Sequence, residues 1–383
     1  MIPFPPPLLN DTNDILLSLT RAALWDREPH LDGPLDSATW ESVYHQARKQ
    51  TVQGIVYDAV CRLPEPQLPP DDLLCTWMEE VGFIESNHHR HLKALAWVTS
   101  RMEAESTLRP IVLKGLPIAN LYPLPSHRVS GDIDLFFGSL ASCEEANRQV
   151  ESWGIPVTYG KYGESSYLTA EVPIEHHGLL VLSHVPWRKK RLRAWIEHRL
   201  TAADSTMEQN VENIPVRVLS PELDLLQLSS HALKHSLNEG IGLRQLCDIT
   251  LFVAHHRKAL PPERVRPLLK RFGLLRWTDL CLSYGLTHLG LSEEQLPFPV
   301  QTRPQQVASM HEEVMQSGNF GFLDERYHTA GESPRQKATA RRISRNVWRY
   351  MRLSPQEALC WSLGLVAIRA GEKAGMSFGE ESE

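Results

Sequence analysis

Two aspartates interrupt an apolar run in the middle of the chain, in the segment GDIDLFF at residues 131–137. If this run is extended, its side chains alternate between two faces, so that Asp132 and Asp134 share one face while Ile133 and Leu135 share the other. Two neighbouring carboxylates repel each other and raise each other's pKa unless a cation lies between them. The pattern therefore predicts a strand that either holds a divalent metal ion or ends in solvent.

The segments around this run predict an α+β fold, in which a small mixed-sheet core is flanked by N-terminal and C-terminal helical regions. We expect further strands in PIVLKG, GIPVTYG, VPIEHHGLLVL and IPVRVLS, and a helix in SLASCEEANRQVESWG. A new helix should begin at Ser220-Pro221, because serine is a good N-cap and proline suits the first helical turn. The expected regions are 1–100 (N-terminal helices), 101–219 (α/β core), 220–300 (helical subdomain) and 301–383 (C-terminal helices with a basic stripe).

Composition excludes several classes of protein. A net charge of −6 gives no global reason to expect nucleic acid. The six cysteines are scattered without a C-x-x-C pair, which argues against a zinc ribbon and against a disulfide framework, and favours reduced thiols in the cytoplasm. The proline-rich N-terminus does not have the pattern of a signal peptide, and no run approaches 18 apolar residues. We therefore expect a cytoplasmic protein without a membrane span.

A second candidate feature precedes the aspartates. Lys114 and Gly115 end a predicted strand, and Pro117 suits the first turn of a following helix. A glycine turn before a helix presents backbone N–H groups that favour a phosphate, although a purely structural strand-to-helix turn has the same pattern.

Other side chains strengthen the phosphate interpretation. Arg128 can bind a phosphate or a carboxylate with two hydrogen bonds, and Ser130 can donate one to an oxygen. Asp132 and Asp134 supply the oxygen ligands that magnesium requires, and Glu175 in a later strand could complete a cluster of three carboxylates. Phosphoryl and nucleotidyl transfer use such carboxylates, with metal ions that activate the attacking oxygen and stabilise the leaving one.

The segments LKGLPIANLYPLPSHRVSGDIDLFF, PIEHH and LSPELDLLQLSSHALKH, followed by GLRQLCDITLFV, resemble a bacterial family of uncharacterised nucleotidyltransferases. That family is part of the DNA polymerase beta-like superfamily and is related to abortive-infection toxin nucleotidyltransferases. The resemblance implies that Asp132 and Asp134 hold both magnesium ions and that Glu175 joins one of them and helps to deprotonate the acceptor. It also implies that Lys114 and Gly115 face the triphosphate. Leu116 departs from the superfamily pattern, which commonly has serine or glycine at this position.

We therefore expect an enzyme that depends on Mg²⁺ (or Mn²⁺) and moves a nucleoside monophosphate from a nucleoside triphosphate to an acceptor hydroxyl or phosphate. A small molecule or a peptide is favoured over tRNA as the acceptor. Two alternatives stay open: a toxin-like enzyme that modifies tRNA, and a catalytically silent binding or scaffold protein, which Leu116 supports.

Three further patterns favour structural roles. His231 and His235 have the i, i+4 spacing of a metal pair but lack the glutamate of H-E-x-x-H, so a packed or hydrogen-bonding pair is favoured over zinc. Arg244 and Asp248 have the spacing of a salt bridge along a helix. The histidines of NHHRH at 87–91 are expected at the solvated surface.

The segment from Pro334 to Arg352 is basic and contains no acidic residue. On a helix, its arginines would form one stripe beside an apolar one. This pattern fits a helix that faces RNA or an acidic partner, but the solvated face of a packed helix is favoured. The stripe consists of Arg341, Arg345, Arg349 and Arg352.

Overall fold

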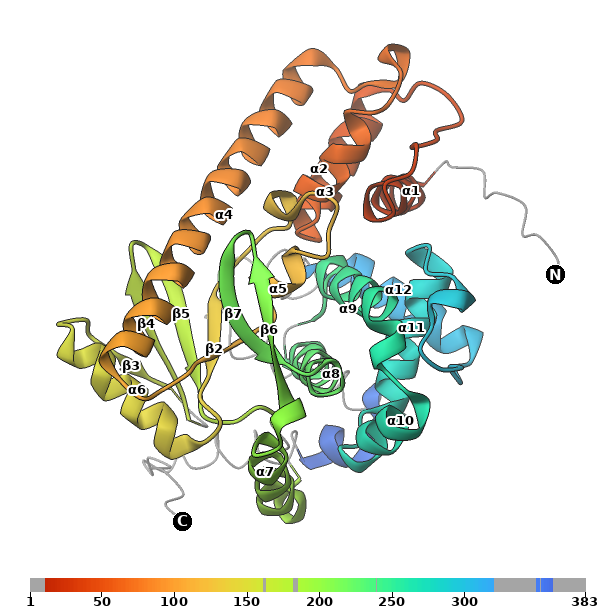
Figure 1. The fold of residues 1–383 in the computed structure, drawn as a ribbon. Helices are drawn as coiled ribbons and strands as arrows, with labels where there is room; N and C mark the ends of the chain where they lie inside the picture. The colour runs from red at the N-terminus through yellow and green to blue at the C-terminus, as the bar shows by residue number, and fades with distance from the viewer. Residues whose placement is uncertain are drawn as a thin grey trace, which may run out of the picture.

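A mixed sheet forms the centre of the protein (Figure 1). The computed structural model describes residues 11–160, 163–181, 185–238, 240–319, 349–351 and 353–360. Within these ranges seven strands lie in the order β3-β4-β5-β2-β1-β7-β6, which confirms the predicted α+β class. Their bounds are β1 Ile111–Leu113, β2 Ile133–Phe136, β3 Thr158–Tyr159, β4 Glu164–Thr169, β5 Val172–His177, β6 Thr206–Val211 and β7 Ile214–Leu219.

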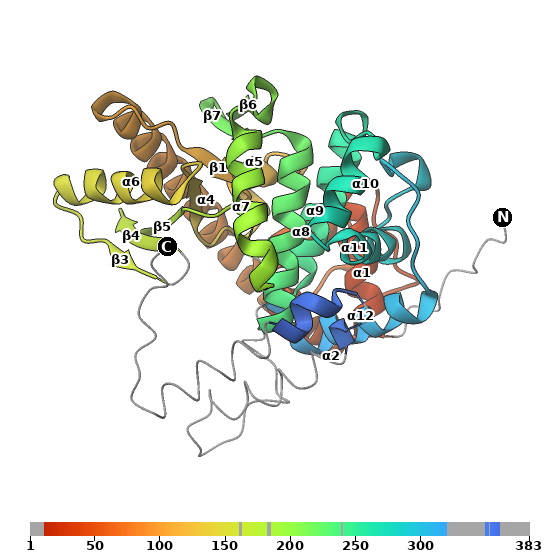
Figure 2. The ribbon, with the colours of Figure 1, turned by 90° about the horizontal axis from the view of Figure 1, so that it is seen from below.

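Helices surround the sheet on both faces (Figures 1 and 2). The α-helices are α1 Thr12–Leu24, α2 Ser37–Lys49, α3 Gln53–Val60, α4 Asp71–Glu105, α5 Leu116–Ala119, α6 Leu140–Ser152, α7 Pro186–Leu200, α8 Pro221–Asn238, α9 Leu243–His256, α10 Pro262–Arg271, α11 Leu275–His288 and α12 Pro304–Ser317. Short 3₁₀ turns are η1 Glu65–Gln67, η2 Pro125–His127, η3 Ala203–Ser205, η4 Arg257–Ala259 and η5 Glu293–Gln295. The predicted helix start at Pro221 is confirmed.

The central strands have the alternation that the sequence predicts. Ile133 and Leu135 pack in one hydrophobic cluster with residues of α4 and α6. Phe136 packs in the other cluster, with residues of α8, α9 and the N-terminal helices. Asp134 has the parity of Phe136, so its side chain leaves the sheet on the face that α8 and α9 cover.

Two hairpins add strands that the sequence analysis did not predict. β4 and β5 are antiparallel and are joined by Ala170 and Glu171, both with positive φ (49° and 66°). β6 and β7 are joined in the same way by Glu212 and Asn213 (φ 45° and 72°). Positive φ at both central residues is the geometry of a type I′ turn, which matches the twist of the strands. Neither turn has the Asn-Gly or Asp-Gly sequence that usually signals it.

The N-terminal helices are continuous with the core. Helix α4 has 35 residues and runs from the N-terminal helices to the sheet, so the predicted boundary at residue 100 falls inside it. Helix α3 approaches η2 so closely that a Cβ atom on Gly54 would lie 2.3 Å from the carbonyl oxygen of His127. The division into four regions stays a prediction.

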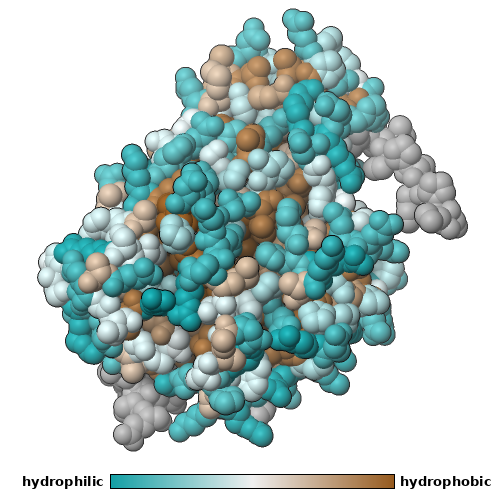
Figure 3. Space-filling view, in the orientation of Figure 1, coloured by the Kyte–Doolittle hydropathy of each residue, from teal (hydrophilic) through white to brown (hydrophobic). Residues whose placement is uncertain are grey.

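The molecular surface on the side of Figure 1 is mostly hydrophilic, and hydrophobic residues gather in a hollow below the N-terminal helices (Figure 3). Among the helices that the structure describes, none is both long and apolar enough to cross a membrane.

Candidate active site

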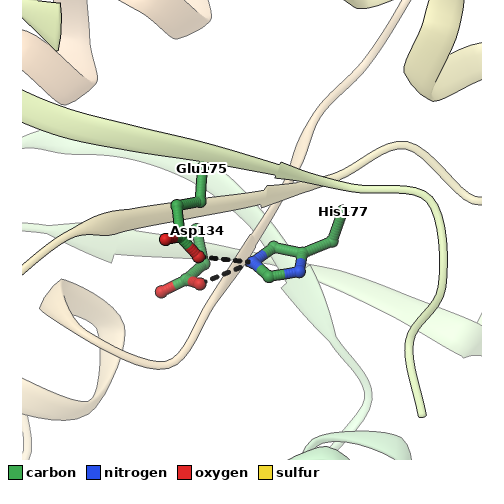
Figure 4. Close-up of side chains that lie close together, drawn as sticks. All are labelled: Asp134, Glu175 and His177. Carbon is green, nitrogen blue, oxygen red and sulfur yellow. Dashed lines mark hydrogen bonds and ion pairs between the residues drawn. The ribbon is translucent and has the colours of Figure 1, made fainter. Parts of the chain in front are cut away.

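Two neighbouring strands bring an acidic pair and a histidine together. β2 and β5 are parallel, and their register places Asp134 beside Glu175. His177 follows Glu175 by two residues and therefore shares its face of the sheet. The Nε2 atom of His177 lies 2.6 Å from Oδ1 of Asp134 and 3.7 Å from Oε2 of Glu175 (Figure 4). Two of the three predicted carboxylates thus converge, and a histidine joins them.

Lys114 adds a positive charge to this cluster. It follows β1, whose last residue, Leu113, pairs with Asp134. Its Nζ atom lies 2.8 Å from Oδ2 of Asp134 and 3.7 Å from Oδ1 of Asp132. Lys114 therefore compensates both aspartates of the DID segment.

The donor atoms are suited to a metal ion. One atom from each of Asp134, Glu175 and His177 lies within 4.8 Å of the other two. Oδ2 of Asp134 is buried and has the ammonium of Lys114 as an ion-pair partner, but it accepts no well-directed hydrogen bond from the described residues. Two carboxylates and an imidazole are ligands that divalent metals accept, so these residues fit the expected group.

The charges of the cluster shift one another's pKa. Burial alone would raise the pKa of Asp134, but Lys114 and the hydrogen bond from His177 lower it to about 2. The pKa of Glu175 is raised, first by burial and then by the negative charges of Asp132 and Asp134. Burial also opposes the charged form of His177, yet the bond to Asp134 raises its pKa. Asp134 is therefore the ionised centre of the cluster.

A cavity of about 540 Å³ lies between this face of the sheet and helices α8 and α9. This volume is within the range of small-molecule sites. Five of the seven predicted site residues line the cavity. It is lined by Lys114, Gly115, Arg128, Asp132 and Glu175, with His177 and residues of α8 and α9, and Asp134 forms ion pairs with two of its lining residues.

Arg128 lines the cavity, but its guanidinium binds a carboxylate of the protein. Its Nε and Nη2 atoms each lie 2.7 Å from an oxygen of Asp248, and the hydroxyl of Tyr122 donates to the same carboxylate at 2.7 Å. Of the two partners foreseen for Arg128, phosphate or carboxylate, the structure contains the carboxylate. Arg128 makes the close ion pair with Asp248 that was predicted for Arg244. Arg244 donates to the carbonyl of Val129 at 2.7 Å.

Ser130, like the buried Asp134, does not belong to the cavity lining. Its side chain is buried, and its hydroxyl has no hydrogen-bond partner among the described residues. Two side chains of helix α4 contact the backbone at Ser130 and Gly131. Asn87 donates to the carbonyl of Ser130, and Nε2 of His91 lies 3.0 Å from the carbonyl of Gly131.

The surface prediction for the histidines of NHHRH is wrong for two of them. His91 is 2% exposed and supports the DID segment, and His88 is 1% exposed and hydrogen-bonds Glu212. Both histidines lie on the buried face of α4, which packs against the rest of the protein.

The turn between β1 and α5 has a positive φ at two successive residues. Lys114 has φ 36° and Gly115 has φ 56° with ψ −117°, a combination that glycine tolerates. The helix that follows has only four residues, and Leu116, its first residue, is 4% exposed and packs in the core. A helix of one turn has little dipole to offer a phosphate, so the helix contribution that the sequence analysis expected is small.

His231 and His235 also face the cavity from α8. Their rings are 4.3 Å apart, and burial, followed by the charge of Lys114, lowers the pKa of His231 well below its usual value. Lys234 lies beside them and pairs with Glu164 at 2.8 Å. The expectation that the two histidines hold no zinc stays a prediction.

The basic stripe falls mostly outside the described residues, which exclude Arg341, Arg345 and Arg352. Arg349 is described, and its guanidinium pairs with Glu313 of α12. This arginine packs against the protein.

The mixed sheet and the acidic residues on its cavity face are those expected of a nucleotidyltransferase. Residues 36–288, more than half of the chain, match the family model described as uncharacterised nucleotidyltransferase, and the protein belongs to that family. A crystal structure described as an antigenic nucleotidyltransferase-like protein from Paracoccidioides brasiliensis is similar at 13% identity and a TM-score of 0.33, over 51% of this chain and 91% of that one. No curated protein matches the chain.

Proposed function

We propose that the protein is a metal-dependent nucleotidyltransferase that moves a nucleoside monophosphate from a nucleoside triphosphate to an acceptor hydroxyl or phosphate. The observation that carries the proposal is the cavity that Asp132 and Glu175 line, with the buried Asp134 paired to its lining residues Lys114 and His177, in a member of a nucleotidyltransferase family.

The acidic residues have distinct roles in this proposal. Asp134, Glu175 and His177 would hold Mg²⁺ or Mn²⁺, with Asp132 at the edge of the cluster. The bound ion would supply positive charge to the phosphate oxygens of the nucleotide. Glu175, with a side chain that is 39% exposed, would accept the proton of the acceptor hydroxyl. Arg128 would act as a positioning residue that holds Asp248 and the wall of the cavity.

Substrate binding is assigned to the same cavity. Lys114 and Gly115 would lie at the phosphates of the nucleotide, because both line the cavity beside the carboxylates. Ser130 would contribute only if its hydroxyl, which has no partner in the described part of the chain, turned toward the nucleotide. The acceptor would be a small molecule or a peptide, and the reaction would take place in the cytoplasm, which the scattered cysteines favour.

Two other functions remain alternatives. A bacterial, toxin-like enzyme that modifies tRNA would use the basic stripe. A silent binding protein would keep the fold but not the reaction. The buried Leu116 favours this alternative, because the superfamily commonly has serine or glycine at that position.

Pyrophosphate release tests the proposal. The protein should release pyrophosphate from at least one of the four nucleoside triphosphates when Mg²⁺ or Mn²⁺ and a cell extract that contains acceptors are supplied. Glu175→Gln should abolish the release, whereas Glu164→Gln, which changes another acidic residue of the cavity, should retain most of it. Absence of release with every nucleotide and both metals would favour the silent binding protein.

A further inference from the structure

The carboxylate of Asp134 has two basic partners, one at each oxygen. Oδ1 faces Nε2 of His177 at 2.6 Å, and Oδ2 faces Nζ of Lys114 at 2.8 Å. Asp134 is 1% exposed, so neither oxygen has bulk water to compensate its charge. The two sides of this carboxylate are therefore two separate positions for positive charge.

Lys114 occupies the position between the two aspartates. Its Nζ lies 3.7 Å from Oδ1 of Asp132 as well as 2.8 Å from Asp134. The lysine side chain is 14% exposed, and the backbone that carries it follows directly from the strand that pairs with Asp134. An ion bound by Asp132 and Asp134 together would have to displace this ammonium.

The other position is built differently. Glu175 lies beside Asp134 in the sheet register, and His177 comes within 3.7 Å of Glu175. These three side chains form the only such group of potential metal ligands among the described residues. Lys114 does not lie between them, so an ion on this side of Asp134 would replace only the proton of the hydrogen bond between His177 and Asp134.

We propose that the protein binds a single divalent ion at Asp134, Glu175 and His177, and that the ammonium of Lys114 serves as the second cation of the site, between Asp132 and Asp134. The inference rests on the metal site of the proposed function and does not require that the transfer reaction occurs. It replaces the expectation that Asp132 and Asp134 hold two ions.

The imidazole in the ligand set decides the choice of probe. Mg²⁺ strongly prefers oxygen ligands, whereas Mn²⁺ accepts both carboxylate oxygen and imidazole nitrogen. Mn²⁺ can also be counted directly, since its electron paramagnetic resonance signal separates the free ion from the bound one.

The experiment counts Mn²⁺ ions bound per chain in the absence of nucleotide. The wild-type protein should bind one ion, and Lys114→Met should bind two, because removal of the ammonium opens the position between the aspartates. Lys234→Met is the matched control: it removes another lysine that lines the cavity and pairs with a carboxylate at 2.8 Å, and it should still bind one ion. His177→Gln should lose the ion or bind it at least tenfold more weakly.

Two tight ions in the wild type, or one ion in a folded Lys114→Met variant, would overturn the proposal. If circular dichroism shows that Lys114→Met does not fold, the wild-type count and the His177→Gln affinity decide: one ion weakened by His177→Gln supports the proposal, and any other result refutes it. One bound Mn²⁺ without pyrophosphate release would leave this inference standing while the proposed reaction fails. Two bound ions with release would do the reverse.

Discussion

At the scale of single residues, the ion pair between Arg128 and Asp248 joins parts of the chain that are 120 positions apart. Both side chains are at most 8% exposed. Replacement of Arg128 by methionine leaves Asp248 buried without its main partner, a change that typically costs about 3–5 kcal/mol. We expect a loss of this size in the free energy of unfolding, measured by denaturant titration.

Tyr122→Phe provides the control, because it removes one hydrogen bond to the same carboxylate and should cost about 1 kcal/mol. Equal losses in the two variants would mean that the guanidinium contributes no more than the hydroxyl.

The buried carboxyl group of Asp224 should make the stability of the protein depend on pH. Burial raises its pKa from 3.8 to about 7. Because the folded state holds the proton more tightly than the unfolded state, the stabilisation is complete below about pH 4 and is lost as the pH rises through 7. A difference of about three pKa units corresponds to a loss on the order of 4 kcal/mol.

The test compares denaturant unfolding of the wild type and of Asp224→Asn between pH 4 and pH 8. The difference in unfolding free energy between the two proteins should shift in favour of Asp224→Asn as the pH rises. A difference that is constant over this range would show that Asp224 keeps an ordinary pKa.

At the scale of elements, the hairpin turns have non-glycine residues in a backbone conformation that favours glycine. Ala170 has φ 49°, and a residue with a Cβ atom in this left-handed region costs roughly 1–2 kcal/mol relative to a relaxed conformation. Ala170→Gly should therefore raise the free energy of unfolding by up to about 1 kcal/mol, measured by thermal or chemical denaturation.

Ala194→Gly, at an exposed position in the interior of helix α7, is the opposite control and should lower stability by about 1 kcal/mol. A loss of stability in both variants would argue against a type I′ turn at Ala170.

The strands of this fold differ in how far the sequence predicts them. β2 is predictable because its alternation places apolar residues on one face and Asp134 on the other. β4 and β6 are mostly polar, and the turns that join them to β5 and β7 lack the usual turn residues. The local sequence therefore has neither the apolar alternation nor the turn motif that would predict these strands.

The same distinction applies to the site. His177 was missed, although its position two residues after Glu175 in a predicted strand already places it on the same face. In contrast, the partner of Arg128 depends on how α9 packs against the sheet. No local sequence pattern contains that information.

At the scale of the whole molecule, the net charge of −6 bears on the acceptor. If tRNA were the acceptor, its binding should weaken steeply with salt, because each neutralised phosphate releases condensed counterions. We expect weak binding of tRNA with little salt dependence, both for the wild type and for the double variant Arg341→Ala, Arg345→Ala, measured by fluorescence anisotropy.

Arg349 is left unchanged in this test because it pairs with Glu313, and its removal would disturb packing. A steep salt dependence that becomes shallower in the double variant would instead favour the enzyme that modifies tRNA.

Helix α4 also determines how small a working fragment of this protein can be. Its residues Asn87 and His91 hold the backbone that leads into Asp132, and Glu85 contacts His127, which also pairs with Asp58 of α3. The predicted core at 101–219 would therefore carry the carboxylates without the scaffold that aims them. A fragment that preserves the candidate site must start before α3, because a chain without its first hundred residues would keep the proposed metal ligands but lose the helices that position them.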